Sequence, residues 1–124
     1  MKVLVVDDSK VTRGMIGRIL REFGFEIVEA SNGLEAIEKV QAEQPELTLV
    51  DWNMPEMNGY EFIKAIRAEP QYDNMKIMMV TTESDIDQMT AALEAGANEY
   101  VMKPFTKDII TEKLAILGVI NANA

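Results

Sequence analysis

The residues best suited to chemistry in this chain stand at the ends of four short apolar runs. Each run ends in a side chain that can bind a cation or a phosphoryl group: Asp7 and Asp8 after residues 3–6, Asp51 after residues 47–50, Thr81 after residues 77–80 and Lys103 after residues 100–102. If each run is a strand of one parallel sheet, the four endings meet at the edge where open α/β sheets place their binding sites. Three carboxylates, a hydroxyl and an ammonium at one sheet edge predict a site that binds or transfers a phosphoryl group.

The three aspartates suggest a divalent cation. Asp7, Asp8 and Asp51 would repel one another if they met without one, and a hard ion such as Mg²⁺ relieves this by binding carboxylates, waters and phosphate oxygens. Asp51 ends a fully apolar run, where a carboxylate is costly to desolvate without a partner. A carboxylate can also act as a nucleophile and form an aspartyl phosphate. The plainer alternative is that these residues only cap a helix and begin a turn.

The hydroxyl and the ammonium complete the predicted site. Thr81 could donate a hydrogen bond to a transferred phosphoryl oxygen, and Lys103 could neutralise its charge. Pro104 restricts the backbone of Lys103 to extended conformations, and the peptide bond between them could be cis. The alternatives are a strand-end threonine and a solvated lysine.

Composition narrows the function classes. The chain has 124 residues, the size of one domain, and a net charge of −9, which argues against direct nucleic-acid binding. No apolar stretch approaches the roughly 20 residues of a membrane span, and the first residues do not resemble a signal peptide. The chain has no histidine, so any phosphohistidine must belong to a partner. It has no cysteine, which is compatible with the cytoplasm, the location we expect.

Along the whole chain, the spacing of apolar residues alternates between that of a strand and that of a helix. Strands are predicted at residues 3–6, 25–30, 47–50, 76–81 and 99–102, with a helix after each one. The strand at 25–30 is interrupted by two glutamates, which indicates a position near the sheet edge. Five β–α units predict an α/β fold in which helices cover both faces of a parallel sheet. We expect one domain over residues 1–124, with its core at about 2–118.

At this point the chain resembles the receiver domain of two-component response regulators, of the single-domain chemotaxis type. The resemblance is carried by the spaced set Asp7, Asp8, Asp51, Met54, Pro55, Gly59, Thr81, Lys103 and Pro104. It covers nearly all of the chain. It implies a doubly wound (βα)5 flavodoxin-like sandwich with strand order 2-1-3-4-5.

The resemblance also implies roles for individual residues. Asp51 would accept a phosphoryl group from the phosphohistidine of a histidine kinase or phosphotransfer protein. Asp8, Asp51 and the backbone carbonyl of Asn53 would bind Mg²⁺, for which Mn²⁺ could substitute. Asp7 would act mainly through water or as a second carboxylate. The residues that would contact the phosphoryl group are Thr81 and Lys103.

Further implied roles concern the lifetime and the output of the signal. Asn53 and Glu83 would tune hydrolysis of the aspartyl phosphate, and Thr81 and Tyr100 would form a switch. The predicted output face comprises Ile86, Met89, Leu93, Tyr100 and Lys113. Its partner would be a downstream protein, with no direct contact to nucleic acid and no membrane insertion. The protein would be a monomer or a weak phosphorylation-linked dimer.

Two other functions remain open from the residues. A Mg²⁺-dependent phosphatase or phosphotransferase could use Asp51 as its nucleophile, although the chain has no room for a substrate-selecting cap domain. An FMN-binding protein could share this fold, but Asp7 and Asp8 in the first loop would repel phosphate without a metal. In the receiver interpretation the protein is no enzyme beyond catalysing its own phosphorylation and dephosphorylation. The chain could also be a receiver excised from a longer protein.

Overall fold

The structure is a computed structural model that describes residues 1–121. The elements in chain order are β1 (Lys2–Val6), α1 (Lys10–Arg21), β2 (Glu26–Ala30), α2 (Gly33–Glu43), β3 (Leu47–Val50), α3 (Gly59–Arg67), the 3₁₀ helix η1 (Pro70–Tyr72), β4 (Lys76–Thr81), α4 (Ile86–Ala95), β5 (Glu99–Met102) and α5 (Lys107–Ile116). The last three residues of the expected domain lie outside the described part. No helix within residues 1–121 is both long and apolar enough to span a bilayer.

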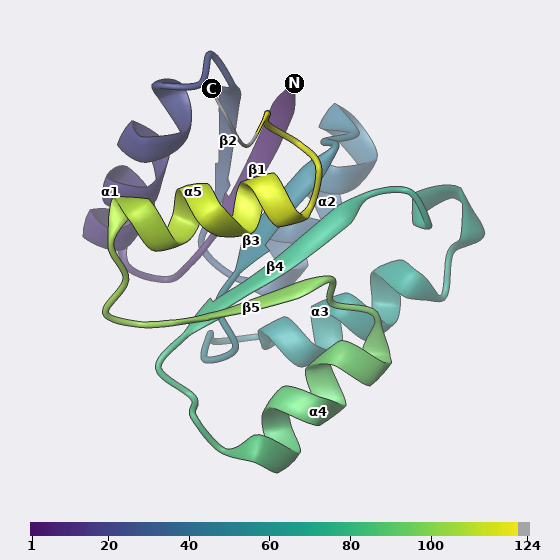
Figure 1. Cartoon of the computed structure of the whole chain (residues 1–124). Helices are drawn as coiled ribbons and strands as arrows, with labels where there is room; N and C mark the ends of the chain where they lie inside the picture. Colours follow the sequence, from purple (N-terminus) through teal and green to yellow (C-terminus); the bar gives the residue numbers. More distant parts are fainter. Residues whose placement is uncertain (122–124) are drawn as a thin grey trace.

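The five strands form one parallel sheet in the order β2-β1-β3-β4-β5. This confirms the predicted fold and strand order, and β2 lies at a sheet edge as its weak alternation indicated (Figure 1). In the register of the central strands, Val6 pairs with Val50, and Val50 pairs with Met79. The carboxyl ends of β1 and β3 are therefore level, and the polar residues that follow them emerge side by side.

The sheet separates two hydrophobic cores, because successive side chains of a strand point to opposite faces. Leu4 and Val6 pack on the side covered by α2, α3 and α4, whereas Val3 and Val5 pack under α1 and α5 (Figure 1). This double burial explains the unbroken apolar runs at residues 3–6 of β1 and 77–80 of β4. Met78 and Met79 of β4 are fully buried in these cores.

Local signals set the helix starts. Ser9 caps α1 by accepting a hydrogen bond from the Thr12 N–H, and Asn32 caps α2 in the same way. Asn58 and Glu61 form a reciprocal capping box at α3. Between α3 and β4, Pro70 begins the short 3₁₀ helix η1. The capped helices α1, α2 and α3 each follow the carboxyl end of a strand, so the connecting loops lie at that edge of the sheet.

Candidate functional site

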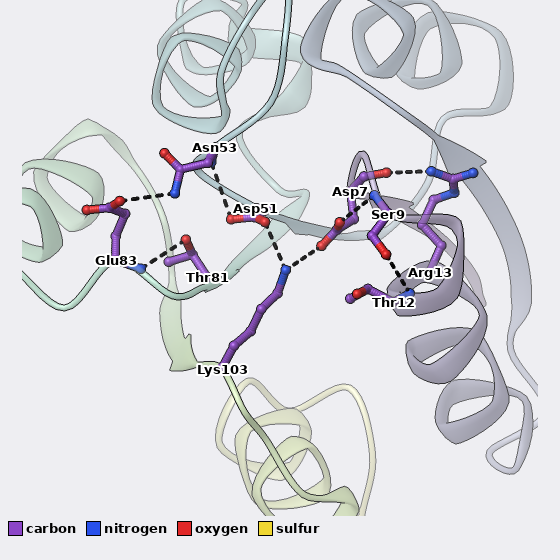
Figure 2. A network of polar contacts seen from close by, with 9 residues as sticks. All are labelled: Asp7, Ser9, Thr12, Arg13, Asp51, Asn53, Thr81, Glu83 and Lys103. Carbon is purple, nitrogen blue, oxygen red and sulfur yellow. Dashed lines mark hydrogen bonds and ion pairs between the residues drawn. The ribbon is translucent and has the colours of Figure 1, made fainter.

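The polar residues predicted from the strand endings do meet at one edge of the sheet (Figure 2 shows Asp7, Asp51, Thr81 and Lys103). Asp7 and Asp51 are buried, with 2% and 7% of their surface exposed, while Asp8 is exposed. One carboxylate oxygen from each of these three aspartates lies within 4.8 Å of the others. Thr81, at the end of β4, is also fully buried.

Lys103 crosses from the end of β5 to the two buried carboxylates. Its Nζ donates to Asp7 Oδ2 at 2.7 Å and to Asp51 Oδ2 at 2.8 Å. Burial alone lowers the pKa of Lys103, but the hydrogen bonds and charges of Asp51 and Asp7 outweigh it, so the pKa is raised. Lys103 precedes a cis peptide bond to Pro104, the isomer that the sequence left open. One ammonium thus bridges two of the three carboxylates and offsets one of their negative charges.

Backbone N–H groups of the loop after β3 help to fix the position of Asp51. The Asn53 N–H donates to Asp51 Oδ1 at 3.3 Å, and the Gly59 N–H donates to the Trp52 carbonyl at 2.9 Å. A Cβ atom at Gly59 would lie 2.1 Å from the Asp51 carbonyl oxygen. Only glycine fits there, so the start of α3 packs directly against the backbone of the candidate nucleophile.

Glu83 links the residues predicted to tune hydrolysis and to switch. Its N–H donates to Thr81 Oγ1 at 3.2 Å, and its carboxylate accepts from Asn53 Nδ2 at 3.0 Å. Its carbonyl accepts from the Tyr100 hydroxyl at 2.8 Å. Burial, followed by the charges of Glu83 and Asp51, raises the pKa of Tyr100, so this phenol keeps its proton. The loop after β4 therefore contacts all three residues.

The five predicted output residues do not share one environment. Ile86 and Leu93 on α4 are exposed, by 76% and 46%, and Met89 packs partly against the core. Tyr100 is 8% exposed and lies within the core cluster beneath α4. Lys113 on α5 pairs with Glu99 at 3.1 Å. In this structure α4 therefore presents the apolar surface of the predicted face, and Tyr100 lies beneath it.

The donor set suits a hard divalent cation. The three aspartates supply oxygen ligands, which Mg²⁺ prefers, and they lie close enough to share one ion. Both carboxylate oxygens of Asp7 already accept protein hydrogen bonds, from the Ser9 N–H at 2.9 Å and from Lys103. The Asp8 side chain has no hydrogen bond or ion pair within residues 1–121, which leaves its oxygens available to an ion.

Arg13 is a site residue that the sequence reasoning missed. One guanidinium nitrogen donates to the main-chain carbonyl of Asp7 at 2.5 Å, and Nε donates to Glu29 Oε1 on β2 at 2.9 Å. A signal was available. Arg13 continues the apolar stripe of Ile16 and Leu20 at helical spacing, and a charge in such a stripe calls for a buried partner.

The sequence of this chain matches a known protein family and several chemotaxis proteins. The family model described as response regulator receiver domain matches residues 3–115. The chain is 44% identical to chemotaxis protein CheY1 of Helicobacter pylori, covering 94% of this chain and 96% of that one. It is 46% identical to a chemotaxis protein CheY homolog of Campylobacter jejuni, covering 95% and 93%.

Solved structures agree with the fold. The chemotaxis protein CheY4 of Vibrio cholerae, crystallised at low pH, superposes with a TM-score of 0.87 at 36% identity. The superposition covers 94% of this chain and 97% of that one. The relatives named above are chemotaxis proteins, so the phosphatase alternative finds no support among them.

Proposed function

Because this chain belongs to the response regulator receiver domain family, whose members act in phosphorylation-activated signalling, we propose that Asp51 is its phosphoryl acceptor. The observation that carries this assignment is the position of Asp51. It is buried at a strand end, its Oδ2 is 2.8 Å from the Lys103 ammonium, and Asp8 lies close by. Within residues 1–121 Asp7 has the same burial, lysine contact and aspartate neighbours, and the spacing of the receiver family's motif favours Asp51 as the acceptor.

Transfer would form a P–O bond to a carboxylate oxygen of Asp51 while the P–N bond of a partner's phosphohistidine breaks. The Lys103 ammonium, fixed between two carboxylates, is placed to neutralise a phosphoryl oxygen. Asp8, Asp51 and the Asn53 carbonyl would hold Mg²⁺ or Mn²⁺, with Asp7 as the buried second carboxylate. When bound, the divalent ion neutralises charge on the phosphoryl oxygens.

The signal would pass through the loop after β4. The Thr81 hydroxyl now accepts a hydrogen bond from the Glu83 N–H, and its proton remains available to a phosphoryl oxygen. A shift of Thr81 would disturb Glu83, whose carbonyl holds the Tyr100 hydroxyl. Phosphorylation would therefore bias the position of α4 and its exposed Ile86. Asn53 and Glu83, hydrogen-bonded to each other at the rim, would tune hydrolysis.

The proposed biological setting is that of a chemotaxis-type receiver. The phosphoryl donor would be a histidine kinase or phosphotransfer protein, and the output would be altered binding to a downstream protein in the cytoplasm. The predicted contact set of Ile86, Met89, Leu93, Tyr100 and Lys113 remains a proposal. So do a single receiver domain over residues 1–124 and a monomer or weak phosphorylation-linked dimer. Catalysis would be limited to the protein's own phosphorylation and dephosphorylation.

Incubation with Mg²⁺ and acetyl phosphate, followed by intact-protein mass spectrometry, tests the assignment. We expect the wild type to gain one phosphoryl group and Asp51→Asn to gain none. Asp73→Asn, which changes an exposed aspartate remote from the site, is the matched control and should react like the wild type. Phosphoryl uptake by Asp51→Asn at the wild-type rate would overturn the assignment.

A further inference from the structure

Arg13 occupies a position on α1 where the helical pattern calls for an apolar residue. It lies three residues before Ile16 and seven before Leu20, both of which are buried under the sheet. Its side chain is only 15% exposed, yet it carries a permanent charge. A guanidinium in such a place needs acceptors, and two are present on different elements.

The two acceptors tie α1 to the strands that flank it. Arg13 donates to the main-chain carbonyl of Asp7, directly after β1, and to the carboxylate of Glu29 near the end of β2 (Figure 2 shows the first contact). The first acceptor belongs to the peptide bond that joins Asp7 to Asp8. Holding this carbonyl oxygen fixes the plane of that peptide bond and therefore the direction in which Asp8 leaves the strand.

Every acceptor group of Asp7 is thereby occupied. Oδ1 accepts from the Ser9 N–H, Oδ2 accepts from Lys103, and the main-chain oxygen accepts from Arg13. The first two contacts orient the Asp7 carboxylate. Only the contact with Arg13 acts on the peptide that leads to Asp8, whose own carboxylate has no partner within residues 1–121.

We propose that Arg13 is a positioning residue for the cation site, holding the Asp7–Asp8 peptide so that the carboxylate of Asp8 faces Asp51, and that Glu29 orients Arg13. The proposal rests on the proposed Mg²⁺ site. Side chains that orient metal ligands from outside the ligand set are worth about 10- to 100-fold in metal affinity. Arg13 reaches the ligands through a backbone oxygen, so we place its effect at the lower end of this range.

The positive charge of Arg13 would lower Mg²⁺ affinity, whereas its positioning of Asp8 would raise it. A lone guanidinium beside the site would repel a divalent cation, so its removal would tighten binding. Glu29 lies 2.9 Å from Nε and offsets this charge, leaving the Arg13–Glu29 pair nearly neutral toward the site. Loss of positioning should therefore exceed relief of repulsion, and the two effects predict opposite changes in affinity.

The test is a Mg²⁺ titration followed by the fluorescence of Trp52, the only tryptophan of the chain and the neighbour of Asp51. We expect Arg13→Met to weaken binding about 10-fold. Arg13→Lys, which keeps the charge and one donor group, should fall between Arg13→Met and the wild type. Arg18→Met removes an exposed arginine of the same helix and should match the wild type within about twofold.

A second measurement separates positioning from general loss of structure. With acetyl phosphate as donor, the Arg13→Met variant should be phosphorylated more slowly at limiting Mg²⁺ and at close to the wild-type rate at saturating Mg²⁺. A variant with a damaged fold would stay slow at both concentrations. If Arg13→Met fails to fold, Arg13→Lys decides. It keeps the positive charge but cannot reproduce both guanidinium contacts, so Mg²⁺ binding should weaken at low and at high salt alike.

Mg²⁺ binding by Arg13→Met as tight as the wild type, or tighter, would overturn the positioning role while leaving the Mg²⁺ site intact. An Arg13→Lys variant that binds Mg²⁺ as tightly as the wild type would do the same if Arg13→Met did not fold. Failure of the wild type itself to bind Mg²⁺ would instead defeat the proposed function. The two failures are therefore distinguishable in one titration series.

Discussion

Asp8→Asn should make the metal-free protein more stable, although it removes a residue of the candidate site. Asp8 has no ion-pair partner within residues 1–121, whereas Asp7 and Asp51 share Lys103. Two negative charges and one positive charge leave a net charge of about −1 facing the Asp8 carboxylate. Neutral asparagine keeps nearly the same shape and removes this repulsion.

The size of the effect follows from the 4.8 Å that bounds the oxygen separations. Two unit charges at 4.8 Å repel by about 0.9 kcal/mol at the dielectric constant of water and by about 3.5 kcal/mol at an effective value of 20. Asp8 is exposed, which favours the lower figure. We expect the free energy of unfolding in EDTA to rise by about 1 kcal/mol, with a melting temperature about 4 °C higher.

Magnesium should reverse the order of stability. A ligand at 100 times its dissociation constant stabilises a folded protein by about 2.7 kcal/mol. The wild type should gain this increment, and Asp8→Asn, which lacks one ligand, should gain little. Urea unfolding followed by circular dichroism, in EDTA and in excess Mg²⁺, measures both differences. The variant should be the more stable protein in EDTA and the less stable one in Mg²⁺.

The control must change the net charge equally at a remote position. Glu38→Gln on α2 removes one negative charge from an exposed side chain far along the sequence from the three aspartates. It should alter stability by less than about 0.5 kcal/mol in either buffer. If Asp8→Asn were less stable than the wild type in EDTA, the reasoning from charge crowding would be refuted.

Three further predictions concern the packing and protonation of the site. Gly59→Ala should lower the free energy of unfolding in urea by at least about 1–3 kcal/mol, because its Cβ meets the Asp51 carbonyl oxygen; unchanged stability would contradict that close approach. Tyr100→Phe should cost about 1 kcal/mol, because the Glu83 carbonyl loses its hydrogen bond, and a stability equal to the wild type would show that water replaces the hydroxyl at no cost. Folding raises the pKa of Lys103, so its stabilisation is complete below pH ~10.4, the ordinary lysine pKa, and is lost as the pH rises through the folded value. Unfolding measured from pH ~9 upwards should show this loss in the wild type and less of it in Lys103→Met.

The sequence predicted most of the fold because its signals are local. A strand buried on both faces reads as an unbroken apolar run, and the residue after the run marks the strand end. Ser9 and Asn32 mark the starts of α1 and α2. Each accepts a hydrogen bond from a backbone N–H three residues later. Five such units leave few topologies once crossovers are right-handed. The three aspartates, Thr81 and Lys103 followed from the same signal, because carboxyl ends of parallel strands share one edge. The other candidate residues came from the resemblance to receiver domains.

The contacts within the site did not follow from local pattern. Arg13 was overlooked because its partners, the Asp7 carbonyl and Glu29, are determined by how α1 packs between β1 and β2. The hydrogen bonds that join Glu83 to Asn53 and Tyr100 likewise depend on the loop after β4 meeting the loop after β3 and the strand β5. The depth of Tyr100, with its ring in the core and only its hydroxyl at the loop, also depends on α4 lying over it.

The sequence by itself determined which side chains reach the functional edge, since strand length and alternation place them there. Tertiary structure alone decided that one lysine holds Asp7 and Asp51, which are 96 and 52 residues away from it, while Asp8 has no cation within residues 1–121. The physical reason is that an ion pair depends on positions in space to within an ångström. Those positions come from the summed packing of the sheet and its helices, which no local pattern of residues records.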